Sequence, residues 1–128
     1  MTKILIFGGS GFIGKHLTNK MDGIYDFLSL SRNLENDSTY SKVANILEPK
    51  SYETLLENTE IIINLVGQVE PDLEKFTASN LVGSLNLLNS AVKYNIKKTT
   101  TGPLSPTNKE NKICHKNIIV RGNPIVEI

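Results

Sequence analysis

Four glycines within residues 8–14 form the first pattern in this sequence that could carry chemistry. Gly9, Gly11 and Gly14 fit the spacing G-x-G-x-x-G, while Gly8, Gly11 and Gly14 fit G-x-x-G-x-x-G. Either pattern alone is a weak signal. The glycine cluster becomes significant because it lies directly after an apolar run and directly before a helical pattern. This is the context that a dinucleotide-binding turn requires.

The chemistry expected of such a turn is the binding of a diphosphate. Glycine accepts the positive φ that a tight strand-to-helix turn needs. A second glycine lets the backbone approach a pyrophosphate closely, and a third lets the helix lie tightly on the strand. Free N–H groups and the positive dipole end at the start of the helix then hold the anion. The alternative is that the glycines serve only a tight structural turn.

The residues that end the second predicted strand indicate which dinucleotide would bind. An acidic side chain about 20 residues after the glycines would hold the ribose hydroxyls of NAD. This sequence has Ser31, Arg32 and Asn33 there, and its first carboxylate comes only at Glu35. A guanidinium can pair with the 2′-phosphate of NADP, which a carboxylate would repel. Arg32 therefore favours NADP over NAD, the alternative being a solvated surface arginine.

The elements that must position these residues alternate between strands and helices. Apolar runs predict strands over residues 4–7, 25–30, 43–46 and 61–66, and helical spacing predicts helices over 12–21, from Ser51, and over 72–94. This alternation predicts an α/β fold, a Rossmann-type parallel sheet with helices on both faces and about four βα units. We assign residues 1–98 to this NAD(P)-binding half-domain. Residues 99–128 are expected to form an irregular tail with one or two short strands, at 118–120 and 125–126.

Helical spacing also predicts which residues the helices bury. The first helix would bury Phe12, Ile13, Leu17 and Met21, and the long helix Phe76, Leu81, Leu85, Leu88 and Val92. Ser51 is expected to cap the short helix between them.

Composition narrows the classes of function. Fourteen Lys and Arg balance thirteen Asp and Glu, and the net charge of +1 indicates no steering toward nucleic acid or an anionic membrane. One Cys and two His are too few for a closed structural zinc site, so no metal site is expected. Because no apolar run is long enough for a signal peptide or a membrane span, a cytoplasmic protein is expected.

Residues 7–14 resemble the nucleotide-binding motif of the extended and atypical short-chain dehydrogenase/reductases, the NAD(P)-dependent epimerase/dehydratase-like group. The similarity continues through residues 31–33 and 61–67, and through Phe76, Asn80 and residues 82–84 to Lys98. It covers roughly residues 2–98. Each piece is unspecific, but the combination is specific.

The resemblance implies further site residues. Asn45 and Ile46 would lie near the adenine, and the family usually has Asp where Asn45 stands. Leu65, Val66 and Gly67 would line the cleft, and Asn80 would brace it; for Asn45 and Asn80, bonding to the local backbone is the alternative. The predicted cofactor-binding residues are thus Gly8, Gly9, Ser10, Gly11, Phe12, Ile13, Gly14, Ser31, Arg32, Asn45, Ile46, Leu65, Val66, Gly67 and Asn80.

The same resemblance implies a catalytic Tyr with a Lys four residues later, which lowers the pKa of the phenol. Tyr94 and Lys98 fit this spacing, but they lie before the expected fifth strand rather than on the helix after it. No Tyr follows Tyr94, and only Thr100 or Thr101 could replace the family's active-site Ser or Thr. Cys114 and His115 are adjacent in a polar tail that would not position them. We therefore assign no catalytic residue.

Three functions follow as hypotheses. The first is an NADP- or NAD-binding Rossmann module, a truncated relative of an epimerase/dehydratase or reductase that does not catalyse alone. The second is an oxidoreductase or epimerase acting on a sugar nucleotide or similar substrate, with a partner chain that completes the site. The third is a regulatory protein that senses the NADP redox state. The dinucleotide is the expected ligand, a small-molecule substrate is doubtful, and an oligomer or partner chain stays open.

Overall fold

The computed structural model describes residues 3–32, 39–66, 81–101, 118–120 and 125–127, the last two segments as backbone only. In chain order the elements are β1 (Lys3–Phe7), α1 (Phe12–Met21), β2 (Asp26–Ser31), β3 (Ser41–Val43), the 3₁₀ turn η1 (Pro49–Ser51), α2 (Glu53–Leu56), β4 (Ile61–Asn64), α4 (Gly83–Lys93), β5 (Lys98–Thr101), β6 (Ile118–Val120) and β7 (Ile125–Glu127).

These strands form one sheet in the order β3-β2-β1-β4-β5-β6-β7. The first five are parallel, and β6 and β7 are added antiparallel at the edge beyond β5. The order reverses between β1 and β4, the switch point at which open α/β sheets bind ligands. The predicted Rossmann-type α/β fold is confirmed, and β6 and β7 coincide with the two short strands predicted in the tail.

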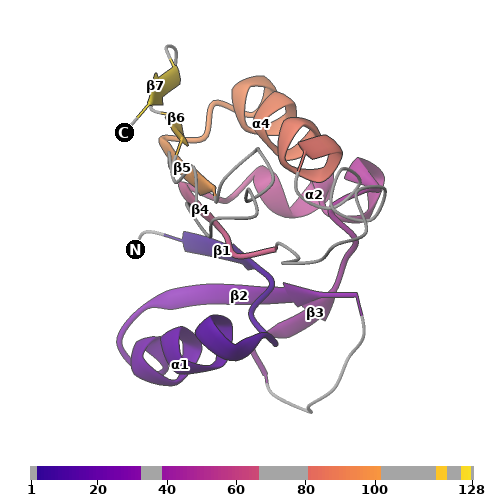
Figure 1. Ribbon diagram of the computed structural model, residues 1–128. Helices are drawn as coiled ribbons and strands as arrows, with labels where there is room; N and C mark the ends of the chain where they lie inside the picture. The colour runs from indigo at the N-terminus through magenta and orange to yellow at the C-terminus, as the bar shows by residue number, and fades with distance from the viewer. Residues whose placement is uncertain (1–2, 33–38, 67–80, 102–117, 121–124, 128) are drawn as a thin grey trace, which may run out of the picture.

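Helices cover both faces of the sheet (Figure 1). On one face, Leu5 and Phe7 of β1 belong to a buried cluster with residues of α2 and α4, among them Leu56 and Leu87. On the other face, Ile4 and Ile6 of β1 cluster with Met21 of α1 and Phe27 of β2. Successive side chains of a strand point to opposite faces, so an uninterrupted apolar run such as β1 has to be covered on both.

Because no apolar run follows Lys98, the sequence predicted an irregular tail from residue 99 rather than a strand. This prediction is wrong for residues 99–101, which belong to β5. β5 pairs in parallel with β4, and Thr99 and Thr101 are buried within it. β-Branched threonine suits a strand, and its methyl group can pack inside. The sheet therefore continues past residue 98, where the sequence placed the end of the half-domain.

The predicted buried faces of the helices are only partly correct. Phe12 and Ile13 are 82% and 65% exposed at the start of α1, whereas Met21 is buried as predicted, together with Gly14 and Thr18. Leu85 and Val92 of α4 are exposed as well, and the buried residues of α4 are Gly83, Ser84, Leu87, Leu88, Ser90 and Ala91. Small residues let both helices lie close on the sheet. Phe76 and the rest of residues 72–80 lie outside the described segments.

The segment after β2 also differs from its prediction. β3 spans Ser41–Val43 rather than residues 43–46, and the N–H of Ala44 after it still donates to the carbonyl of Ser31 at the end of β2, at 2.9 Å. Ser51 does not cap α2, which begins after Tyr52. The Ser51 hydroxyl instead bonds the carbonyl of Glu48 at 2.6 Å and both backbone groups of Asn45 at 3.0 Å, so it holds this turn together.

Candidate functional site

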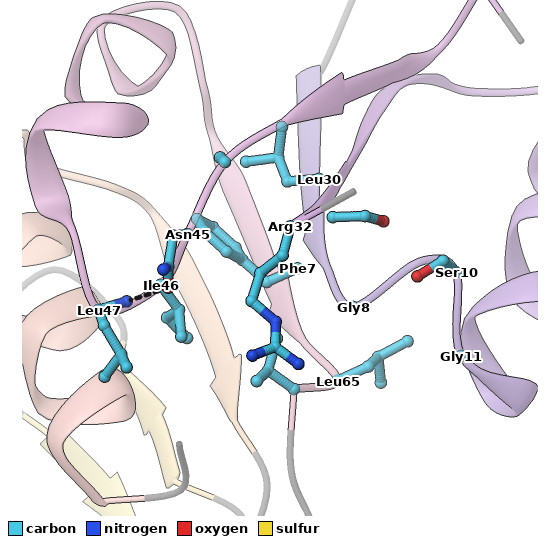
Figure 2. Close-up of a pocket in the computed structure, with 13 residues that line it drawn as sticks. Phe7, Gly8, Ser10, Gly11, Leu30, Arg32, Asn45, Ile46, Leu47 and Leu65 are labelled. Atoms are coloured by element: carbon cyan, nitrogen blue, oxygen red, sulfur yellow. Dashed lines mark hydrogen bonds between the residues drawn. The ribbon is translucent and has the colours of Figure 1, made fainter. Parts of the chain in front are cut away.

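A cavity of about 240 Å³ opens at the carboxyl ends of β1, β2 and β4 (Figure 2). Its lining residues are Phe7, Gly8, Ser10, Gly11, Leu30, Ser31, Arg32, Ala44, Asn45, Ile46, Leu47, Leu65 and Val66. The predicted cofactor-binding residues among them are Gly8, Ser10, Gly11, Ser31, Arg32, Asn45, Ile46, Leu65 and Val66. Four lining residues were not predicted as cofactor-binding, although each is next to a predicted residue in the sequence: Phe7, Leu30, Ala44 and Leu47.

Four other predicted residues are described by the structure and do not line the cavity. Gly9 and Gly14 form the back of the glycine turn, and Phe12 and Ile13 begin α1 with exposed side chains. Gly67 and Asn80 lie outside the described residues.

The turn from β1 to α1 needs glycine at Gly8 for two reasons. Its φ is +81°, and a Cβ there would come within 2.9 Å of the backbone of Leu65 and Val66. The N–H of Gly8 donates to the carbonyl of Leu30 at 3.0 Å, which ties the turn to the end of β2. The first glycine thus places the turn against the ends of both neighbouring strands.

Gly11 differs because the space beside it is open. A Cβ on Gly11 would find its nearest neighbour, the carbonyl oxygen of Gly8, at 3.5 Å, an ordinary contact. Its φ of −72° and ψ of 179° suit any residue. The protein itself therefore does not require glycine at this position. Gly11 lines the cavity, so a ligand lying close to its backbone is what would require it.

The first turn of α1 has the groups that bind an anion. Its N-cap is Gly11, which has no side-chain capping hydrogen bond, and its first turn contains no acidic residue. The first bond within the helix is donated by the N–H of Lys15 to the carbonyl of Gly11 at 2.9 Å. The N–H groups that precede Lys15 in an α-helix have no acceptor within it, and they are available to a phosphate.

Arg32 lies between the two ends of the cavity. Figure 2 shows its guanidinium between the glycine turn on one side and residues 45–47 on the other. Arg32 is exposed and forms no ion pair with any residue that the structure describes. A cation at the end of β2 without an acidic partner can pair with an anionic group of a ligand.

Asn45 forms the other end of the cavity, and its side chain bonds the local backbone. Its Oδ1 accepts a hydrogen bond from the N–H of Leu47 at 3.0 Å (Figure 2). The Asn45 carbonyl accepts from the N–H of Glu48 at 2.9 Å, which closes the turn. Asn45 therefore bonds the local backbone, which was one of the two roles that the sequence left open, and it also lines the cavity.

A buried polar cluster lies directly behind the cavity, and sequence reasoning missed it. Asn64 at the end of β4 donates from Nδ2 to Thr101 Oγ1 at 2.8 Å and to Ser84 Oγ at 3.3 Å. Its Oδ1 accepts from the N–H of Val66 at 3.0 Å. All three side chains are buried. The cluster fixes the turn after β4 that carries Leu65 and Val66 into the cavity; the signal for it was Asn64 itself, a polar residue inside an apolar run.

None of the tyrosines and lysines in the described segments lines the cavity. Tyr94 ends α4 and is partly buried against the core, with the Lys93 ammonium 5.4 Å from its ring centre, while Lys98 is exposed at the start of β5. Tyr52 is fully buried, with its ring edge-on to Phe7. Burial raises the pKa of the Tyr52 phenol above its ordinary value, and the nearby Glu53 acts in the same direction against a lowering hydrogen bond with Ser90.

The described residues contain neither a metal-binding cluster nor a membrane-spanning helix. No cluster of three or more His, Cys, Asp or Glu side chains that could hold a metal ion occurs there. None of the described helices combines the length and the apolarity needed to cross a membrane. Cys114 and His115 lie outside these segments.

Comparison with known sequences matches this chain to one protein family. The sequence profile of the NAD dependent epimerase/dehydratase family matches residues 4–102. A dTDP-D-glucose 4,6-dehydratase from Dictyostelium discoideum is 32% identical over 75% of this chain, and Protein CapI from Staphylococcus aureus is 30% identical over 74%. The chain covers 27% and 35% of the lengths of these two proteins.

Solved structures agree on the fold. The UDP-glucose 4-epimerase of Thermotoga maritima, solved with UDP-glucose, has a TM-score of 0.66 and 25% identity over 77% of this chain and 36% of its own. A uronate dehydrogenase mutant from Agrobacterium tumefaciens complexed with NAD has a TM-score of 0.63 and 17% identity over 73% of this chain and 37% of its own. WbmG of Bordetella bronchiseptica, also solved with NAD, has a TM-score of 0.64 and 19% identity over 76% of this chain and 36% of its own.

Proposed function

Because this chain belongs to the NAD dependent epimerase/dehydratase family, we propose that it binds a nicotinamide dinucleotide in the cavity at the carboxyl ends of β1, β2 and β4. The diphosphate lies over the glycine turn and takes hydrogen bonds from the first N–H groups of α1. The observation that carries the proposal is the open space at Gly11. The fold does not need glycine there, whereas a diphosphate close to the backbone does.

The dinucleotide that we propose is NADP in preference to NAD. Arg32 extends from the end of β2, where the adenosine ribose of a dinucleotide lies in this fold. Its guanidinium has no acidic partner among the described residues and can accept the 2′-phosphate in a bidentate pair. Among the described residues, no carboxylate lines the cavity to hold the free ribose hydroxyls of NAD instead.

We propose further that the residues of this cavity bind the dinucleotide without doing chemistry on a substrate. Hydride transfer in this family's manner needs a proton donor or acceptor beside the nicotinamide. In the part of the chain that the structure describes, the lining has no Tyr, Lys, His, Asp or Glu that could play this part. The binding half of an oxidoreductase site is therefore the role that these residues support.

A second candidate is an oxidoreductase or epimerase acting on a sugar nucleotide, completed by residues from a partner chain. The observation in its favour is the class of its relatives, which include a dTDP-D-glucose dehydratase and a UDP-glucose epimerase. The test is an activity assay with UDP- and dTDP-sugars and both dinucleotides, run on each species separated by size-exclusion chromatography. Turnover by an oligomer would support this candidate over the non-catalytic one, and an inert monomer would count against it.

Binding itself is tested with Gly11→Ala. The added Cβ has room in the protein, so the variant should unfold at the same urea concentration as the wild type. It nevertheless occupies the space of the diphosphate, so the Kd for NADPH measured by calorimetry should rise at least about tenfold. The matched control is Asn19→Ala on the exposed side of α1, which should leave both quantities unchanged. Wild-type protein that takes up no dinucleotide at millimolar concentration would refute the proposal.

A further inference from the structure

We propose that Ser51, which does not line the cavity, positions the cavity wall formed by residues 45–47 and thereby sets how tightly the dinucleotide binds. This inference rests on the proposed function, because it concerns the affinity of the same cavity. It makes Ser51 a positioning residue, since its hydroxyl acts on the ligand only through the backbone that it bonds.

The wall formed by residues 45–47 lies across the cavity from the glycine turn (Figure 2). All three of its residues line the cavity, and the Arg32 guanidinium lies between the wall and the turn. The wall belongs to neither a helix nor a strand, so no regular ladder of backbone hydrogen bonds fixes it. The width of the cavity therefore depends on the individual bonds that hold this segment.

The Ser51 hydroxyl bonds the wall at both ends. Ser51 Oγ accepts a hydrogen bond from the N–H of Asn45 at 3.0 Å. Its own O–H lies within reach of two carbonyls, that of Glu48 at 2.6 Å and that of Asn45 at 3.0 Å, and it donates to one of them at a time. Ser51 thus links the residue that begins the wall to the residue that follows it.

Ser51 is itself held in place, because the next residue is anchored in the core. The Tyr52 side chain is fully buried, and its ring lies edge-on to Phe7 of β1 with 4.9 Å between the ring centres. The N–H of Ser51 also donates to the carbonyl of Glu48 at 2.9 Å. The hydroxyl therefore ties the wall of the cavity to a part of the chain that the core holds.

Among the residues that the structure describes, one other side chain bonds the wall from outside it. The Tyr52 hydroxyl lies 3.5 Å from the carbonyl of Ile46, which is at the long limit for such a bond. The bonds from the N–H groups of Leu47 and Glu48 to Asn45 lie within the turn, so they keep its shape without placing it against the sheet. Loss of the serine hydroxyl would therefore leave the wall more weakly placed.

The experiment compares two substitutions of Ser51 by their Kd for NADPH, measured by calorimetry. Ser51→Ala removes the hydroxyl and should raise the Kd about fivefold, the usual worth of one such hydrogen bond. Ser51→Thr keeps the hydroxyl, and the exposed position leaves room for the added methyl group, so its Kd should stay within about twofold of the wild type. The matched control is Thr54→Ala, which removes an exposed hydroxyl on α2 and should leave the Kd unchanged.

The rescue by threonine distinguishes positioning from a general loss of stability. A variant that stays folded without denaturant would keep the native Kd if only its stability were lowered, and urea unfolding of each variant checks that it is folded. Ser51→Cys, whose thiol is a poor donor and acceptor, replaces Ser51→Ala if the alanine variant does not fold, and its Kd should rise in the same direction.

The outcomes separate this inference from the function on which it rests. A folded Ser51→Ala protein with the wild-type Kd would overturn the role of Ser51 while leaving dinucleotide binding in place. Equal weakening by Ser51→Ala and Ser51→Thr would also overturn it, because the hydroxyl would then not be the group that matters. Wild-type protein that binds no NADPH at millimolar concentration would instead refute the proposed function, and the inference with it.

Discussion

Gly14 lies so close behind the glycine turn that a Cβ on it would overlap the carbonyl oxygen of Gly8 and come within 2.6 Å of the Cα of Gly9. Both neighbours are backbone atoms of the turn, which is anchored by the bond between Gly8 and Leu30. They cannot move aside without shifting α1 against β1. Within one motif, therefore, Gly14 is required by packing and Gly11 is not.

The first prediction separates these two glycines. Gly14→Ala should lower the free energy of unfolding by about 1–3 kcal/mol, the usual cost of forcing an extra carbon into a filled site. Gly11→Ala should lower it by no more than about 0.5 kcal/mol, because its nearest contact is 3.5 Å away. Urea unfolding followed by circular dichroism measures both. Equal losses in the two variants would contradict the packing argument.

The second prediction concerns two threonines of β5 that are equally buried. Thr101 Oγ1 accepts from Asn64 Nδ2 at 2.8 Å, whereas Thr99 Oγ1 has no partner among the described residues. Valine has nearly the shape of threonine without the hydroxyl. Thr101→Val should therefore destabilise the protein by about 1–3 kcal/mol, since it leaves a buried amide donor with one weaker partner. Thr99→Val should be neutral or stabilise it by about 1 kcal/mol, because it removes an unpaired buried hydroxyl.

The two threonine variants act as controls for each other in thermal or urea unfolding. If both changes destabilise equally, β-branched packing and not hydrogen bonding decides the stability of β5. If Thr101→Val also raises the Kd for NADPH, the turn after β4 depends on the cluster around Asn64, as its bond to the Val66 N–H indicates.

What could be predicted from the sequence was local. The apolar run of β1, the glycines and the start of α1 follow one another within residues 3–21, and their order alone specifies the turn. Arg32 was identifiable for the same reason, as the residue at the end of a strand next to that turn. Neither prediction needed a contact between distant parts of the chain.

What the sequence could not indicate depends on such contacts. Thr101 is buried because β5 pairs with β4 and because Asn64 and Ser84, from two other elements, bond its hydroxyl. In α4, the sets containing Leu85 or Leu87 both fit a helical period, so spacing could not show which one faces the sheet. The structure buries the set with more small residues, which allows closer packing.

The third prediction uses the buried phenol of Tyr52. Burial raises the pKa of this group above its ordinary value of about 10, so the unfolded chain ionises first as the pH rises. The contribution of Tyr52 to stability is therefore complete below pH 10 and is lost as the pH rises from about 10 through the folded-state pKa. Tyr52→Phe should show a smaller fall in stability over this range. Urea midpoints at pH 8 and pH 11 test it, and parallel falls in both proteins would disprove it.

The fourth prediction concerns the choice of cofactor by Arg32. Arg32→Ser should weaken NADPH binding by about 10- to 100-fold, the usual worth of a charge-assisted hydrogen bond to a phosphate, and should change NADH binding little. Arg32→Asp should weaken NADPH binding further by repulsion and strengthen NADH binding, because a carboxylate can accept from the ribose hydroxyls. Calorimetry with both cofactors measures the four Kd values. Lys42→Ser, on the neighbouring β3, is the matched control, because it removes one exposed cation that does not line the cavity. Equal effects of Arg32→Ser on the two cofactors would mean that the guanidinium does not contact the 2′-phosphate.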